Sequence, residues 1–259
     1  EERDGIWRCI NNNYDIINNL IEEVKPKCKI SAMIDCWEFS IENLLPRNKT
    51  NLDLIRVCTK KENLVEALDM CRKIKNMEYE VSLNIIYCSH LSDLDMDNIV
   101  NVIEKDFLEN GEYLDYICFA DSMGATGSLH IKKIINKFRN SGIKVGIHLH
   151  NNEGSSLSNI ISSVDGKVDM IDGTYEGIGK NGGNANLEFI ILYLQLKHKH
   201  NFNIKVLLEF MDNNFSNTAV NNIKSFLLKL SNVHYSKVNN NLQTYEFYKN
   251  IETIKNKLP

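Results

Sequence analysis

The chain has 259 residues, of which 43% are hydrophobic and 25% charged, values typical of a folded globular protein. Its 30 basic and 34 acidic residues leave a formal net charge of -4 and form no long block of one sign, which argues against a nucleic-acid surface or a polybasic membrane patch. The longest apolar run, around residues 189–196, is far shorter than the ~20 residues that a membrane span requires. Composition therefore excludes a fibre, a membrane protein and a disordered tail.

The cysteines indicate a reducing compartment. Their number is odd, no two form a CxxC pair, and most lie inside apolar runs, where a free thiol behaves as a small hydrophobic group. No cationic start is followed by an apolar segment, so nothing predicts secretion. We therefore expect a cytoplasmic protein with free thiols at Cys9, Cys28, Cys36, Cys58, Cys71, Cys88 and Cys118.

Short β-branched runs alternate along the chain with longer helical segments. The predicted strands are residues 28–35, 52–58, 80–88, 113–120, 143–149 and 168–174. Between them, apolar residues recur at helical spacing over residues 64–74, 99–107, 131–138 and 157–164. Repeated strand–helix units at a near-constant period predict an α/β protein with a parallel sheet, either doubly wound or a (β/α) barrel.

Two features favour the barrel. No glycine-rich dinucleotide loop follows an early strand, as a Rossmann fold would require. Polar residues collect at the predicted carboxyl ends of the strands, where barrels place their chemistry: Asp35, Arg56, Asn84, Asp121, Ser122, His148, His150 and Thr174. We therefore expect a (β/α)8 TIM-type barrel over residues 1–200, with its first one or two strands absent from this chain. A helical extension over residues 201–259 is expected to cap the barrel.

His148 and His150 are the strongest candidates for metal ligands. Residues two apart in a strand point the same way, so both imidazoles are expected to project into the barrel mouth, as a divalent metal site requires. The alternative from the residues alone is a hydrogen-bonded histidine pair without metal.

A glycine-rich loop follows the last predicted strand, over residues 177–184. Its four glycines permit a tight fold over a ligand, with backbone N–H groups facing an anion, although a flexible turn is the alternative. A helix is expected to begin directly after it, with Asn184 or Asn186 as the N-cap.

Three motifs in this order resemble a known family. DSMG at 121–124, GIHLHNN at 146–152 and GIGKNGGNANLE at 177–188 are similar to the metal-dependent aldolase and acyltransferase barrels called DRE-TIM (HMGL-like) metallolyases. The resemblance covers about residues 28 to 195, and its motif pairing is most like that of the 4-hydroxy-2-oxovalerate aldolase branch.

The resemblance implies a role for several residues. It makes His148 and His150 metal ligands, and places Asn184 on an asparagine that completes or approaches the metal site in some members. Ser122 falls where these enzymes hold a small hydroxyl residue near the substrate carboxylate. Arg56, at the end of a middle strand, is a second candidate for that carboxylate, and a structural ion pair at the rim is its alternative.

The family takes an aspartate ligand and a catalytic arginine from its first strand. Arg3-Asp4-Gly5 spells part of that motif, but only one strand–helix unit fits between Gly5 and the strand near Ile30. If the two histidines lie on the seventh strand, the strand at 28–35 is the third, and the first lies upstream of Glu1. We therefore expect the true motif upstream, with the missing strands in a longer protein, supplied by another chain, or lost in a degenerate relative.

The activity that the resemblance implies is a class II aldolase reaction. A divalent ion, Mn²⁺ or Mg²⁺ with Zn²⁺ as an alternative, would bind a 2-oxo acid and stabilise an enolate as a carbon–carbon bond of a 4-hydroxy-2-oxo acid breaks, giving pyruvate or a similar acid and an aldehyde. Alternatives are a Claisen-type acyltransferase of the isopropylmalate or homocitrate synthase kind and a non-catalytic barrel. By analogy we expect a homo-oligomer and, as in some relatives, a dehydrogenase partner, with no nucleic acid or membrane partner.

Overall fold

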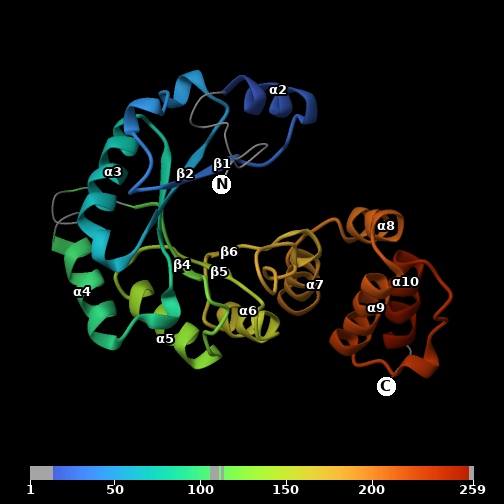
Figure 1. Ribbon diagram of the computed structural model, residues 1–259. Helices are drawn as coiled ribbons and strands as arrows, with labels where there is room; N and C mark the ends of the chain where they lie inside the picture. Colours follow the sequence, from blue (N-terminus) through green and yellow to red (C-terminus); the bar gives the residue numbers. More distant parts are fainter. Residues whose placement is uncertain (1–13, 106–110, 112–113, 257–259) are drawn as a thin grey trace. The chain divides into compact units, whose positions relative to one another are not determined.

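The computed structural model describes residues 14–105, 111 and 114–256 (Figure 1). The chain divides into two compact units. The first takes in the chain up to His148 together with residues 162–171, and the second comprises residues 149–161 and the chain from Asp172 onward. Arg3, Asp4, Gly5 and Cys9 lie outside the described residues.

The first unit contains a six-stranded sheet whose strands follow the chain order, β1-β2-β3-β4-β5-β6. The pairs β1–β2, β2–β3, β3–β4 and β5–β6 are parallel. This confirms the predicted α/β class and the consecutive strand–helix order. The strands are β1 (Ser31–Asp35), β2 (Leu54–Thr59), β3 (Glu80–Ile85), β4 (Tyr116–Asp121), β5 (Val145–Leu149) and β6 (Met170–Ile171).

Helices connect most of these strands, and α3, α4 and α5 line one side of the strands in Figure 1. The predicted apolar face of α5 is completely buried at Ile131, Ile134, Ile135 and Phe138. Between β1 and β2 the chain forms only two short 3-10 helices, η2 (Ile41–Asn43) and η3 (Arg47–Lys49). The helices are α2 (Tyr14–Val24), α3 (Leu64–Asn76), α4 (Asp93–Ile103), α5 (Ser128–Arg139) and α6 (Ser156–Asp165).

Register places polar residues of neighbouring strands on one face of the sheet. Cys58 lies opposite Asn84, and Asn84 lies opposite Cys118. Side chains alternate along a strand, so Arg56 shares this face with Cys58, whereas the fully buried Ile55 and Val57 point the other way.

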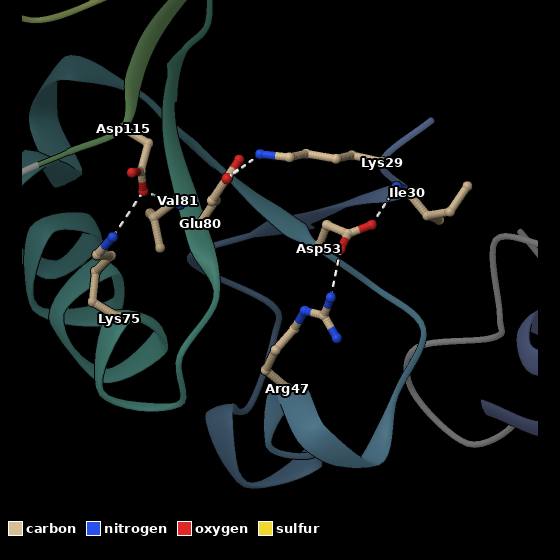
Figure 2. A network of polar contacts seen from close by, with 8 residues as sticks. All are labelled: Lys29, Ile30, Arg47, Asp53, Lys75, Glu80, Val81 and Asp115. Atoms are coloured by element: carbon tan, nitrogen blue, oxygen red, sulfur yellow. Dashed lines mark hydrogen bonds and ion pairs between the residues drawn. The ribbon is translucent and has the colours of Figure 1, made fainter. Parts of the chain in front are cut away.

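Aspartates hold the amino ends of the strands. Asp53, before β2, accepts the backbone N–H of Ile30 at 2.8 Å, and Asp115, before β4, accepts that of Val81 at 2.8 Å (Figure 2). Asp169, before β6, accepts the N–H of Val145 at 2.9 Å in the same way. An aspartate before each even-numbered strand thus caps the start of the preceding strand.

Lysine and arginine side chains complete two of these contacts. Arg47 donates to Asp53 at 2.5 Å, Lys75 donates to Asp115 at 2.9 Å, and Lys29 pairs with Glu80 beside them (Figure 2). These contacts at the strand starts concern the stability of the sheet, because the chemistry of such folds lies at the opposite, carboxyl ends.

The second unit is mainly helical. Its helices are α7 (Leu187–His198), α8 (Ile204–Asn214), α9 (Asn217–Ser231) and α10 (Thr244–Lys255), with η8 (Tyr235–Lys237) before the last. The rings of Phe189 and Phe226 join α7 to α9, with centroids 4.8 Å apart. Asp212 in α8 accepts the N–H of Thr244 at 2.7 Å and so caps α10. The predicted helical C-terminal segment is present; its boundary at residue 200 and its capping of the barrel stay predictions.

The structure corrects three details of the strands. Arg56 is the third of six residues in β2, so its predicted place at a strand end is wrong. β3 stops at Ile85 because Tyr87 takes a left-handed backbone with φ 58°, which an extended strand cannot contain. Thr174 does not belong to β6 but pairs in an isolated bridge with Asn186.

The six cysteines in the described part of the chain are all free thiols, and Cys58, Cys71, Cys88 and Cys118 are buried, as predicted. Burial raises the pKa of the Cys88 thiol to about 12 and also raises that of Cys71. None of the described helices is long and apolar enough to cross a membrane.

Candidate metal-binding site

The two candidate histidines lie at the carboxyl end of β5. His148 is the fourth of its five residues, and His150 directly follows its last residue. Both side chains are partly exposed, as a ligand that must meet a metal and a substrate requires. His148 belongs to the first compact unit and His150 to the second.

The glycine-rich loop lies against the chain at His150. The N–H of Asn151 donates to the Gly183 carbonyl at 2.8 Å, and the N–H of Ala185 donates to the Leu149 carbonyl at 2.8 Å. These bonds flank an antiparallel bridge between His150 and Asn184. Two residues 34 positions apart, both predicted as ligands, are thereby adjacent.

Glycine is required where the loop closes on itself. Gly177 and Gly183 have φ values of 68° and 87°, and a Cβ at Gly183 would collide with the Gly177 carbonyl oxygen. That oxygen accepts the N–H of Asn184 at 2.8 Å. The loop is therefore a closed backbone structure that holds Asn184, which the flexible-turn alternative does not describe.

The Asn184 side chain presents an oxygen. Its Nδ2 donates to the Ile178 carbonyl at 3.1 Å, which fixes the orientation of the amide. Its Oδ1 is buried, and no donor among the described residues reaches it. A buried amide oxygen without a donor is unfavourable unless another group binds it, and amide oxygen is a ligand that Mg²⁺ and Mn²⁺ accept.

His150 and Asn184, which the bridge joins, offer an imidazole and an amide oxygen, donor types that a divalent metal accepts. The assignment of His148, His150 and Asn184 as metal ligands stays a prediction. No cluster of three or more His, Cys, Asp or Glu side chains suited to a metal occurs within residues 14–105, 111 and 114–256. The carboxylate ligand expected by resemblance therefore has no counterpart in the described part of the chain.

Arg56 lies in a polar cluster on the sheet face that carries Asn84 and Cys118. The Asn84 amide is oriented so that its nitrogen donates to Ser82 Oγ and its oxygen faces Arg56. That oxygen accepts from Arg56 Nη2 at 2.9 Å and from Nε at 3.0 Å. Arg56 Nη2 also lies 3.3 Å from the Cys118 sulfur. These contacts hold the positive charge of Arg56 in a fixed position.

Ser122 follows β4 and contacts the chain after β3. Its Oγ accepts the N–H of Tyr87 at 3.3 Å, which leaves its O–H able to donate to a ligand. The preceding Asp121 is completely buried and accepts the N–H groups of Ala125 and Thr126 at 3.2 and 3.0 Å. Asp121 thus shapes the turn that presents Ser122.

Sequence reasoning assigned no role to Glu188, the last residue of the third motif. The structure shows it in the first turn of α7 with only 2% of its surface exposed, and burial raises the pKa of its carboxyl group. Its Oε1 accepts the N–H of Glu176 at 3.2 Å. The one feature of the sequence that could have pointed to Glu188 is its position, as an acidic residue directly before an apolar run.

The helix after the loop begins as expected. Asn186 is the N-cap of α7, with its Oδ1 accepting the N–H of Phe189 at 3.1 Å. Asn184, the other N-cap candidate, lies in the glycine-rich loop and does not cap the helix.

Comparisons with known proteins give relatives with several activities, among them an aldolase and a synthase. The 4-hydroxy-2-oxovalerate aldolase of Spirochaeta aurantia is 26% identical over 159 residues, or 60% of this chain and 44% of the relative. The homocitrate synthase of Pyrococcus horikoshii is 35% identical over 81 residues, or 31% of this chain and 22% of the relative. The matched part of the chain spans less than half the length of either curated relative.

Solved structures share the fold. The N-terminal domain of a Bacteroides vulgatus protein has a TM-score of 0.64 at 22% identity, covering 92% of this chain and 76% of that one. HMG-CoA lyase of Bacillus subtilis has a TM-score of 0.56 at 16% identity, covering 83% of this chain and 74% of that one. With the consecutive parallel sheet, these neighbours confirm a TIM-type barrel fold.

The HMGL-like family model matches residues 29–213, well over half of the chain and all three motifs. The chain therefore belongs to the HMGL-like family of metal-dependent lyases and synthases.

Proposed function

We propose that this chain forms part of a divalent-metal-dependent carbon–carbon lyase, an aldolase that cleaves a 4-hydroxy-2-oxo acid into a 2-oxo acid and an aldehyde. One observation carries the proposal: the bridge that sets Asn184, with its buried Oδ1 facing no donor among the described residues, beside His150. The aldolase relative from Spirochaeta aurantia supports the choice of reaction.

His148, His150 and Asn184 would hold the metal ion. A bound divalent ion would act as a Lewis acid that polarises the ketone of the 2-oxo acid. The chain's own contribution is to fix the ligands before substrate arrives: the loop backbone holds Asn184, and β5 orders the histidine side of the site.

Arg56 and Ser122 would bind the substrate carboxylate. The guanidinium of Arg56, oriented by Asn84 and Cys118, would bring a fixed positive charge to that carboxylate. The O–H of Ser122 is a donor for the same kind of group, because its oxygen already accepts from Tyr87.

The first test is Mn²⁺ binding to the full-length protein, measured by calorimetry. The double variant His148→Ala/His150→Ala should lose binding, because it removes two of the three proposed ligands. A matched control is His198→Ala/His200→Ala, a second His-x-His pair that lies at the end of α7 rather than after a strand. Arg56→Lys should bind Mn²⁺ like the wild type, since Arg56 is assigned to the substrate and not to the metal.

Retro-aldol turnover of 4-hydroxy-2-oxo acids with Mn²⁺ then tests the reaction. Two results together support the proposal: the wild type turns over the substrate, and Arg56→Lys lowers kcat/KM mainly by raising KM. Absence of Mn²⁺ binding by the full-length protein, or binding that survives in the His148/His150 variant, would overturn the metal site and favour a non-catalytic barrel.

A Claisen-type acyltransferase is the second candidate. The 35% identity to a homocitrate synthase over 81 residues favours it. It would share the metal and the oxo acid but consume acetyl-CoA, so release of free CoA from acetyl-CoA in the presence of 2-oxo acids distinguishes the two reactions.

A further inference from the structure

A buried carboxylate, that of Glu188, contacts the residue that precedes the glycine-rich loop. Glu188 is 2% exposed, which is rare for a glutamate, and only its Oε1 has a partner among the described residues, the N–H of Glu176 at 3.2 Å. The Oε2 is buried without a hydrogen bond from the described chain. A buried acid with one oxygen unsatisfied is costly, so its presence calls for a physical reason.

The partner of Glu188 has a strained backbone. Glu176 has φ 51° and ψ 16°, the left-handed conformation that is unfavourable for a non-glycine residue. Gly177, the next residue, is also left-handed with φ 68°. The chain reverses at these two residues, and the carboxylate of Glu188 accepts the N–H of Glu176.

A short run of contacts connects this reversal to the proposed metal ligand. Glu188 holds Glu176, Glu176 is bonded to Gly177, and the carbonyl of Gly177 accepts the N–H of Asn184 at 2.8 Å. The Asn184 side chain in turn donates to the carbonyl of Ile178, the residue after Gly177. The backbone and side chain of Asn184 are therefore both held by residues that the reversal at Glu176 places.

We propose that Glu188 is a positioning residue that locks the reversal at Glu176 and thereby orients Asn184. This inference rests on the proposed function for its consequence in metal binding, but its effect on the loop is measurable without any metal. Glu188 touches neither metal nor substrate and acts through Glu176 and Gly177.

The test uses three variants of the full-length protein. Glu188→Gln keeps an oxygen acceptor at nearly the same place, whereas Glu188→Met keeps the length and helix propensity but has no oxygen. Glu252→Met is the matched control, because Glu252 also has a buried, unpartnered oxygen in the same compact unit but lies in α10, away from the loop in sequence.

The metal-free readout is amide hydrogen exchange of residues 176–184. Glu188→Met should accelerate exchange of the Asn184 amide at least tenfold without affecting the amides of α9, while Glu188→Gln and Glu252→Met should resemble the wild type. Unchanged exchange in Glu188→Met would overturn the inference. Should Glu188→Met not fold, Glu188→Asp, whose carboxylate is too short to reach Glu176, is expected to accelerate exchange in the same way.

The second readout is the Kd for Mn²⁺. Residues that orient a metal ligand typically change affinity by about 10- to 100-fold, so Glu188→Met should weaken binding by about tenfold or more and Glu188→Gln should restore most of it. Equal Kd values for Glu188→Met and the wild type would contradict the orienting role. If the wild type binds no Mn²⁺, the proposed function fails, while the exchange data still decide whether Glu188 locks the loop.

Discussion

At the scale of single residues, two left-handed residues lie in loops that follow strands. Tyr87 comes two residues after β3 and Glu176 five residues after β6, and a side-chain oxygen from elsewhere in the chain accepts the N–H of each. Strained residues persist only where the surrounding structure determines them. These two hydrogen bonds are therefore contacts that help to hold the two loops in their strained conformation.

The strain at Tyr87 predicts an inverted ranking of two substitutions. Glycine normally destabilises a folded position relative to alanine by about 0.4–1 kcal/mol through the unfolded chain. At Tyr87 the left-handed conformation costs alanine about 1–2 kcal/mol, so Tyr87→Gly should be the more stable variant. Urea denaturation measures both.

The exposed Tyr235 in η8 serves as the control. Its backbone is helical, so Tyr235→Ala should be more stable than Tyr235→Gly. If Tyr87→Ala proves the more stable of its pair, the strain assigned to Tyr87 is absent in solution.

At the scale of secondary-structure elements, the aspartates at the amino ends of β2, β4 and β6 explain how the sheet begins. Each accepts one N–H at the start of the preceding strand, and that donor would otherwise lack this hydrogen-bond partner. An aspartate directly before every second strand means that the first unit repeats every two strand–helix units. The spacing of the apolar segments alone does not reveal this repeat.

Asp115→Ala should destabilise the protein by about 1–3 kcal/mol, because it leaves the N–H of the buried Val81 without its acceptor and removes the partner of Lys75. Thermal or urea unfolding followed by circular dichroism measures the loss. Asp69→Ala is the control: its ion pair with Lys73 is exposed on α3, so it should cost no more than about 0.5 kcal/mol. A cost for Asp115→Ala as small as that of Asp69→Ala would show that the strand starts need no cap.

At the scale of the whole molecule, the helical C-terminal segment and the loop-bearing part of the chain are one compact unit. Phe226 of α9 is buried against Phe189 of α7, the helix that begins directly after the glycine-rich loop. The C-terminal helices therefore contribute to the stability of the element that carries Glu188 and Asn186.

Phe226→Ala should cost about 3–5 kcal/mol of stability through the cavity it leaves between α7 and α9. Phe202→Ala, at a residue before α8 with 39% of its surface exposed, should cost far less. Unfolding monitored by circular dichroism compares the two, and similar losses for both would mean that the α7–α9 contact does not form in solution.

The expected homo-oligomer and dehydrogenase partner also belong to this scale and stay predictions. Light scattering on the full-length protein measures the first directly.

The amino-acid sequence by itself determined the alternation of strands and helices, the buried faces of the helices and the order of the three motifs. These depend on local patterns: β-branched runs form buried strands, and apolar residues every three or four positions form one side of a helix. The free buried cysteines followed from the same apolar runs. The resemblance to the HMGL-like family followed from three sequence motifs, which can be recognised without knowing any tertiary contact.

Only the tertiary structure decided how those parts act together. It moved Arg56 from a strand end to the middle of β2, beside Asn84 and Cys118, and it brought Asn184 against His150. It also buried Glu188, whose carboxylate accepts the N–H of Glu176. Each of these contacts joins residues separated by 12 to 62 positions, and their energy depends on which groups the fold brings together, which no local pattern of residues encodes.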